Sequence, residues 1–197
     1  RLHRFELGQE EKRVRHALNL ASQGRTVALI SSGDPGIYAM ATLVYEILES
    51  TDTESDEHSE WSRIRVVSSP GISAMQAAGA LAGAPLGHDF CSISLSDLLT
   101  PWDTIKNRIV SAAKSDFVIA FYNPVSTKRV NQLSEAHEIL LKHRSPDTPV
   151  IVAHNVGRSG ERVNVVTLFN MEPSEVNMLT VIIVGSSQSK KIKLPNG

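Results

Sequence analysis

Three apolar runs of the sequence end in small or turn-forming residues and lead directly into a helical pattern. The runs end at residues 31–36, 68–73 and 122–124. Strands that alternate with helices form β-α-β units, and ligands of such sheets bind beyond the carboxyl ends of the strands. Each turn alone could serve only to cap the helix that follows it. The three together favour an α/β fold with a small-molecule site at these strand ends.

The periodicity of the apolar residues predicts the elements of the first half. We expect helices at 9–23, from 34 to 48 and from residue 73, strands at 26–32 and 64–69, and a solvated acidic loop at 49–60. Asp34 is predicted to cap the second of these helices and Pro35 to occupy its first position. These elements predict a small α/β domain over residues 1–89, built on a mostly parallel sheet.

The second half mixes strands linked by helices with neighbouring strands. We expect strands at 90–96, 116–122, 149–154, 162–168 and 179–187 and helices at 102–114 and 126–143. This pattern predicts a second α/β domain over residues 90–197, with a mixed sheet. The expected architecture is therefore two small α/β domains with a ligand cleft between them.

Composition narrows the class of partner. Of the 197 residues, 41% are hydrophobic. The formal net charge is −1, so no strong positive field draws the chain to nucleic acid or to a membrane surface. Cys91 is the single cysteine, so no internal disulfide can form. No apolar run approaches the ~18 residues of a membrane span. We expect a cytoplasmic protein with a small-molecule substrate.

Several common sites do not match the motifs of this chain. Gly33-Asp34-Pro35-Gly36 fits neither the dinucleotide-binding pattern nor the phosphate-binding loop. The seven histidines are scattered and show no metal-binding spacing, so we expect no metal, and the G-x-S-x-G motif of hydrolases is missing. The residues alone therefore indicate a small-molecule site formed by backbone and small side chains.

Six segments together resemble the tetrapyrrole (corrin/porphyrin) methyltransferases. They are "VALISSGDPGIYAMA", "VVSSPGISAMQAAGALAGAPLGHDF", "SLSDLLTPW", "FVIAFYNP", "GRSGERV" and "TVIIVGSS". The resemblance runs from about Glu10 to Ser187 and is strongest to the branch that methylates precorrin-3B at carbon 17 and contracts its ring in cobalamin biosynthesis. It implies a homodimeric two-domain enzyme that binds S-adenosylmethionine. Family members begin with a strand and a G-x-G-P-G loop, so we expect a segment before residue 1.

The resemblance also implies the residues of the site. The implied cofactor contacts are Ser32, Gly33, Asp34, Ile37, Ser73, Ala74, Tyr122, Val156 and Thr180. Asp97 is the candidate for acid–base work during ring contraction, with capping of the turn before Leu98 as its alternative role. The substrate carries many carboxylates, and its candidate contacts are Ser96, Lys128, Arg129, Arg158 and Arg162. For each cation, solvated surface charge is the alternative.

Other readings stay open at this point. A methyltransferase of the same fold could act on another precorrin, on ribosomal RNA or on a diphthamide precursor, and a domain without activity could only bind a partner. His137 falls on the apolar stripe of its helix and is expected to belong to the core or its boundary. For His154, at the end of a strand, both a structural and a functional role remain open.

Overall fold

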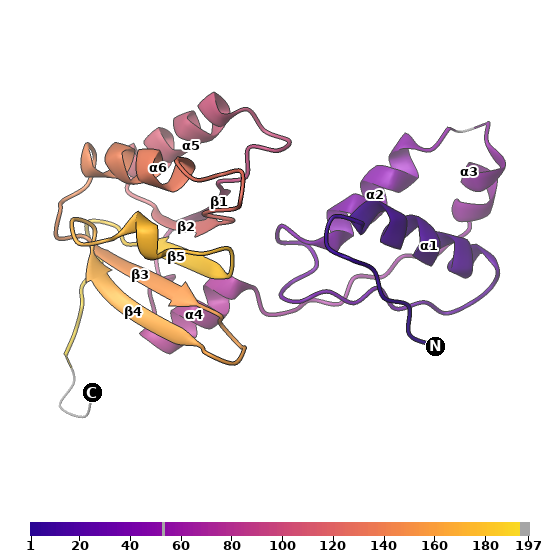
Figure 1. Cartoon of the computed structure of the whole chain (residues 1–197), viewed down its shortest axis with the longest axis horizontal. Coiled ribbons are helices and arrows are strands. Elements are labelled where there is room, and N and C mark those ends of the chain that lie inside the picture. Colours follow the sequence, from indigo (N-terminus) through magenta and orange to yellow (C-terminus); the bar gives the residue numbers. More distant parts are fainter. Residues whose placement is uncertain (53, 194–197) are drawn as a thin grey trace. The chain divides into compact units, whose positions relative to one another are not determined.

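The structure is a computed structural model that describes residues 1–52 and 54–193. It consists of two compact units, Arg1–Ser73 and Ala74–Gly197, and we describe each by itself (Figure 1). No helix in the described ranges is long and apolar enough to cross a membrane.

Unit 1 is a cluster of three helices, α1 (Glu10–Ser22), α2 (Met40–Ser50) and α3 (Asp56–Trp61). Its core holds Val14 and Leu18 of α1 together with Met40, Ile47 and Trp61. Trp61 is buried, and its indole N–H donates to the Asn19 side-chain oxygen at 3.0 Å. The solvated loop predicted at 49–60 is therefore wrong over its second part, because burial of the Trp61 ring against α1 stabilises a short helix there.

The strands predicted at 26–32 and 64–69 are not formed, and no strand occurs among the residues of unit 1 that the structure describes. Both segments instead line a cavity of about 840 Å³ together with α1 and α2. A strand requires a partner that accepts and donates its backbone hydrogen bonds. The two segments border the cavity and do not pair with each other, so the expected parallel sheet is absent from the described part of residues 1–89.

Unit 2 is built on a five-stranded mixed sheet with the strand order β1-β2-β5-β3-β4. The strands are β1 (Phe90–Ser94), β2 (Val118–Tyr122), β3 (Pro149–His154), β4 (Arg162–Thr167) and β5 (Thr180–Val184). β1 and β2 are parallel, β5 is antiparallel to both β2 and β3, and β4 is antiparallel to β3. The predicted α/β class and the mixed sheet of the second half are confirmed.

Helices cover both faces of this sheet. α5 (Trp102–Lys114) and α6 (Gln132–Leu141) lie over one face and α4 (Ala74–Ala82) over the other (Figure 1). A short 3-10 helix, η1 (Pro173–Glu175), contacts α6. Since α4 packs on β3, β4 and β5, unit 2 begins at Ala74, earlier than the boundary predicted after residue 89.

A buried arginine joins the segments at one end of the sheet. The Arg144 guanidinium is paired with Asp116 and donates to the carbonyl oxygens of Phe117 at 2.7 Å and Ala112 at 3.3 Å. Asp116 has a φ of 60° and also accepts hydrogen bonds from the Ser187 backbone N–H and hydroxyl. These hydrogen bonds hold the pKa of Asp116 below its usual value. The cluster connects the end of α5, the start of β2 and the segment that follows β5.

Candidate functional site

The strand directions of unit 2 bring several predicted site residues to one edge of the sheet. β1, β2 and β3 run in the same direction, so their carboxyl ends share this edge with the first residues of β4 and β5. Asn123 and Asn155, which follow β2 and β3, both have left-handed backbones with φ of 52° and 50°. Asparagine tolerates this conformation better than most residues, and it turns the chain sharply at the edge.

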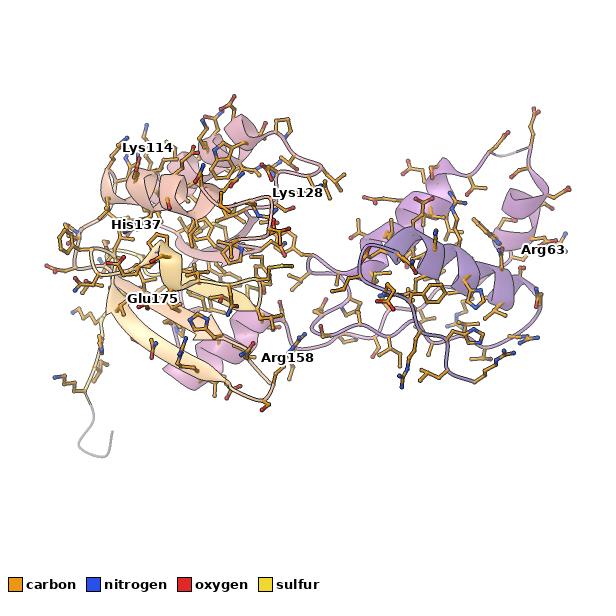
Figure 2. The ribbon with its side chains drawn as sticks, in the orientation of Figure 1. Arg63, Lys114, Lys128, His137, Arg158 and Glu175 are labelled. Carbon is orange, nitrogen blue, oxygen red and sulfur yellow. The ribbon has the colours of Figure 1, made fainter. Side chains whose placement is uncertain are left out.

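A cavity of about 170 Å³ lies at this edge. Its walls come from the start of α4, the ends of β2 and β3 and the beginning of β5, and they are Ala74, Tyr122, Asn123, Ala153, Asn155, Val156, Arg158, Met178, Leu179, Thr180 and Val181. Four of these, Ala74, Tyr122, Val156 and Thr180, are positions that the family resemblance implies for the cofactor. Arg158, implied for the substrate, is an exposed side chain of the loop after β3 (Figure 2).

Tyr122 connects the end of β2 with the helix beside the cavity. Its hydroxyl oxygen accepts a hydrogen bond from the Met75 backbone N–H at 3.0 Å. Met75 lies in the first turn of α4, where backbone N–H groups have no partner within the helix. The tyrosine therefore fixes the start of α4, including Ala74, relative to the edge of the sheet.

His154 lies behind the cavity as the last residue of β3. The residue is 3% exposed, and its Nδ1 lies 2.8 Å from the Thr180 hydroxyl oxygen. Burial lowers the pKa of His154, the positive charge of Arg162 lowers it further, and Glu175 acts in the opposite direction. The imidazole is therefore neutral at physiological pH.

A second group of predicted residues comes together beside Asn123. Arg129 Nη1 donates to the Ser96 hydroxyl at 3.2 Å and lies 3.7 Å from Asp97 Oδ1, while Arg129 Nε donates to the Asn123 carbonyl at 3.0 Å. Gln132 donates to Asp97 Oδ2 at 2.8 Å. The side chains of Arg129 and Asp97 are 11% and 35% exposed, respectively. Sequence reasoning missed Gln132 and Asn123, because only the turn after β2 brings them to Asp97 and Arg129.

The remaining predicted cations lie at the surface of unit 2. Arg162 is exposed at the first position of β4, opposite His154 in the β3–β4 ladder. Lys128 is exposed in the turn between β2 and α6 (Figure 2). Among the residues that the structure describes, no three His, Cys, Asp or Glu side chains gather as a metal site.

In unit 1, Asp34 joins the two predicted strand ends. Its Oδ1 accepts from the Gly36 N–H at 2.8 Å and its Oδ2 from the Gly71 N–H at 3.0 Å. These two backbone hydrogen bonds, that of Gly71 first, hold the pKa of Asp34 below its usual value. The capping role predicted for Asp34 and Pro35 is wrong, because α2 begins only at Met40 and the carboxylate is engaged by the two turns.

Gly71 is the closest point between these two turns. A Cβ at residue 71 would lie 2.2 Å from the Gly33 carbonyl oxygen, a distance that only glycine permits. Of the other residues implied for the cofactor in unit 1, Ser32 and Gly33 are exposed, Ile37 is half-buried and Ser73 is buried. The structure thus brings together the turns at 33–36 and 70–71 in unit 1, and Ala74, Tyr122, Val156 and Thr180 in unit 2.

Comparison with known proteins identifies the family. The model of the Tetrapyrrole (Corrin/Porphyrin) Methylases matches residues 2–172. The chain is 48% identical over 181 residues to the cobalt-factor III methyltransferase of Priestia megaterium, covering 92% of this chain but only 33% of that protein. It is 41% identical over 185 residues to a precorrin-3B C(17)-methyltransferase of Sinorhizobium sp, covering 94% of this chain and 70% of the relative.

A solved structure agrees with these matches. The crystal structure of the methyltransferase CobJ superposes with a TM-score of 0.89 at 40% identity, and the match covers 98% of this chain and 77% of that one. The similarity therefore extends through nearly all of the chain in both sequence and fold. The chain belongs to the tetrapyrrole methylase family.

Proposed function

We propose that the chain acts as an S-adenosylmethionine-dependent methyltransferase that methylates carbon 17 of precorrin-3B, or of its cobalt-containing counterpart, with ring contraction. The observation that carries this proposal is the cavity formed by Ala74, Tyr122, Val156 and Thr180. The names of the Priestia and Sinorhizobium relatives support the substrate class.

The walls of the cavity suit one end of the cofactor. At about 170 Å³ it is smaller than a pocket for a whole drug-sized ligand. Val156, Leu179 and Met178 provide apolar surface, and Leu179 and Met178 are 50% and 62% exposed beside it. A flat nucleoside base, with apolar faces and a polar edge, matches a site of this kind. We therefore assign to it the adenosine end of the cofactor.

The chemistry requires little from side chains. When bound, S-adenosylmethionine supplies a methyl group that its sulfonium charge already activates. Holding two reactants in the correct geometry can contribute on the order of 7–11 kcal/mol to a reaction. A cavity of small and apolar residues whose turns are fixed by Tyr122, Asn123 and Asn155 is suited to such positioning.

The substrate is expected beside the cations of the same edge. Arg158 is exposed and lines the cavity, so it is the first candidate to bind a carboxylate of the macrocycle. Lys128 and Arg162 are exposed candidates as well. Arg129 donates to Ser96 and Asn123, and we assign to it the support of the Asp97 loop. Asp97, which Gln132 and Arg129 hold, remains our candidate for acid–base work on the ring.

Two measurements test the proposed function. Calorimetric titration with S-adenosylhomocysteine should give micromolar binding, whereas a domain without activity that only binds a partner would show no heat. Mass spectrometry of an incubation with precorrin-3B or cobalt-precorrin-3 should then show the added methyl group.

The alternatives lead to other outcomes. The chain could instead leave precorrin-3B unchanged and methylate another precorrin, ribosomal RNA or a diphthamide precursor. That result would support a methyltransferase but contradict precorrin-3B as its substrate. We further propose a cytoplasmic homodimer. Light scattering at the expected dimer mass checks the assembly, and a monomer mass would contradict it.

A further inference from the structure

The Thr180 hydroxyl, on the wall of the unit 2 cavity, has three partners within the protein. The Asn177 backbone N–H donates to it at 3.2 Å, and it donates to the Asn177 side-chain oxygen at 3.1 Å. The third partner is Nδ1 of His154, at 2.8 Å. A hydroxyl group has one donor and two acceptor positions. These three contacts therefore occupy its full capacity.

This count determines which nitrogen of His154 carries the proton. The hydroxyl proton goes to Asn177, and one of its lone pairs accepts from the Asn177 N–H. The remaining lone pair can only accept, so Nδ1 of the neutral imidazole must be the protonated nitrogen. His154 thus donates to Thr180 and does not accept from it.

The same contacts fix the turn that forms one wall of the cavity. The Asn177 side-chain oxygen also accepts from the Leu179 N–H at 2.8 Å, and the Leu179 carbonyl accepts from the Asn155 N–H at 2.9 Å. Leu179, Thr180 and Asn155 all line the cavity. His154 and Thr180 are direct neighbours in the β3–β5 ladder, so the imidazole is a rigid support for this turn.

We propose that His154 is a positioning residue that holds the Thr180 hydroxyl toward the protein, so that Thr180 meets the ligand through its methyl group and backbone only. This extends the proposed function, because it depends on that function for the identity of the ligand. Arg162 on β4 and Glu175 on η1 are the charged groups that act on the imidazole. Thr180 therefore determines the shape of the cavity and does not donate a hydrogen bond to the cofactor.

The first test needs no ligand. Nitrogen NMR of the full chain with labelled histidine should show His154 as the Nδ1–H tautomer at neutral pH. The Nε2–H tautomer would overturn the assignment, because Thr180 would then donate to His154. This result does not depend on whether the chain binds S-adenosylhomocysteine.

The second test is a double-mutant cycle on S-adenosylhomocysteine affinity. His154→Leu and Thr180→Val should each weaken binding about tenfold, because each leaves the support of the 177–180 turn incomplete. The double variant should bind no more weakly than Thr180→Val, since Thr180→Val already removes the one hydrogen bond to Thr180 that His154→Leu removes. His154→Asn, whose amide can occupy the position of Nδ1, should restore most of the affinity.

A matched control separates positioning from general stability. His137→Leu removes another histidine of unit 2, which contacts the Leu168 carbonyl from α6 at 2.7 Å and does not line the cavity (Figure 2). It should lower the melting temperature but leave the Kd unchanged. If His154→Leu behaves in the same way, the positioning role is overturned. If the wild-type chain does not bind the ligand, the proposed function fails, while the tautomer of His154 still decides whether His154 donates to Thr180.

Discussion

Apolar runs of similar appearance have different outcomes in the two units. In unit 2, β3 and β5 pair with each other, each has a second neighbour in the sheet, and β5 is completely buried. In unit 1, residues 26–32 and 64–69 form no ladder, and Ile30 and Val67 are 80% and 72% exposed. The comparison shows that an apolar run specifies a strand only where another strand satisfies its backbone.

Hydrogen exchange gives the largest expected difference between the two units. Amides in β2, β3 and β5 should exchange at least about 10³-fold more slowly than those of residues 26–30 and 65–68, because the ladder opens only with global unfolding. The measurement is mass spectrometry of exchanged peptides. Similar protection in both units would show that the unit 1 segments are paired in solution and would break the comparison.

Arg144→Ala tests the cluster that closes the sheet of unit 2. The Arg144 side chain is 3% exposed, and its loss removes the ion pair with Asp116 and the hydrogen bonds to the carbonyls of Phe117 and Ala112. We expect the free energy of unfolding to fall by about 3 kcal/mol. Urea denaturation followed by Trp102 fluorescence, in a Trp61→Phe background, reports on this unit. Arg108→Ala, at an exposed position of α5, is the control and should change stability by less than about 0.5 kcal/mol.

Gly71→Ala tests the junction of the two turns in unit 1. The new methyl group would lie 2.2 Å from the Gly33 carbonyl oxygen, so the backbone must shift. We expect the free energy of unfolding to fall by about 2 kcal/mol. Denaturation monitored by Trp61 fluorescence, in a Trp102→Phe background, measures this loss. The control Gly87→Ala, in unit 2, places its methyl 3.5 Å from the Ala84 carbonyl oxygen, an ordinary contact. Followed by Trp102 fluorescence in a Trp61→Phe background, it should cost nothing. An equal effect of both variants would remove the special role of the junction.

The smallest expected effect is the contribution of His154 to the pH dependence of the unfolding free energy. Its folded-state pKa is lowered, so the unfolded chain binds the proton more readily. The stability of unit 2 is therefore complete above the ordinary histidine value of 6.5 and decreases as the pH falls from there toward the folded-state pKa. When denaturation is measured at several pH values over this range, the unfolding free energy of His154→Leu should change less with pH than that of the wild type. Unchanged pH dependence in that variant would assign the effect to another group.

Much of unit 2 could be predicted from the sequence. Helix α5 has the predicted bounds of 102–114, and each of the five predicted strands of the second half is present. The strand at 90–96 and the helix at 126–143 are shorter in the structure, as β1 and α6. The acidic composition of residues 49–60 predicts a solvated loop, whereas α3 forms from Asp56, because that composition gives no sign that Trp61 contributes to the core. Burial of one aromatic side chain outweighed the composition of its neighbours.

The sequence by itself determined where the chain turns and which faces are apolar, because both depend on residue types at short spacing. It also placed Ala74, Tyr122, Val156 and Thr180 among the candidate site residues through the family motifs. Only the tertiary structure decided which groups pair: Asp34 with Gly71, Arg129 with Asn123, and His154 with Thr180. A hydrogen bond depends on the distance between two atoms in space. The folded backbone sets that distance, and local periodicity carries no record of it.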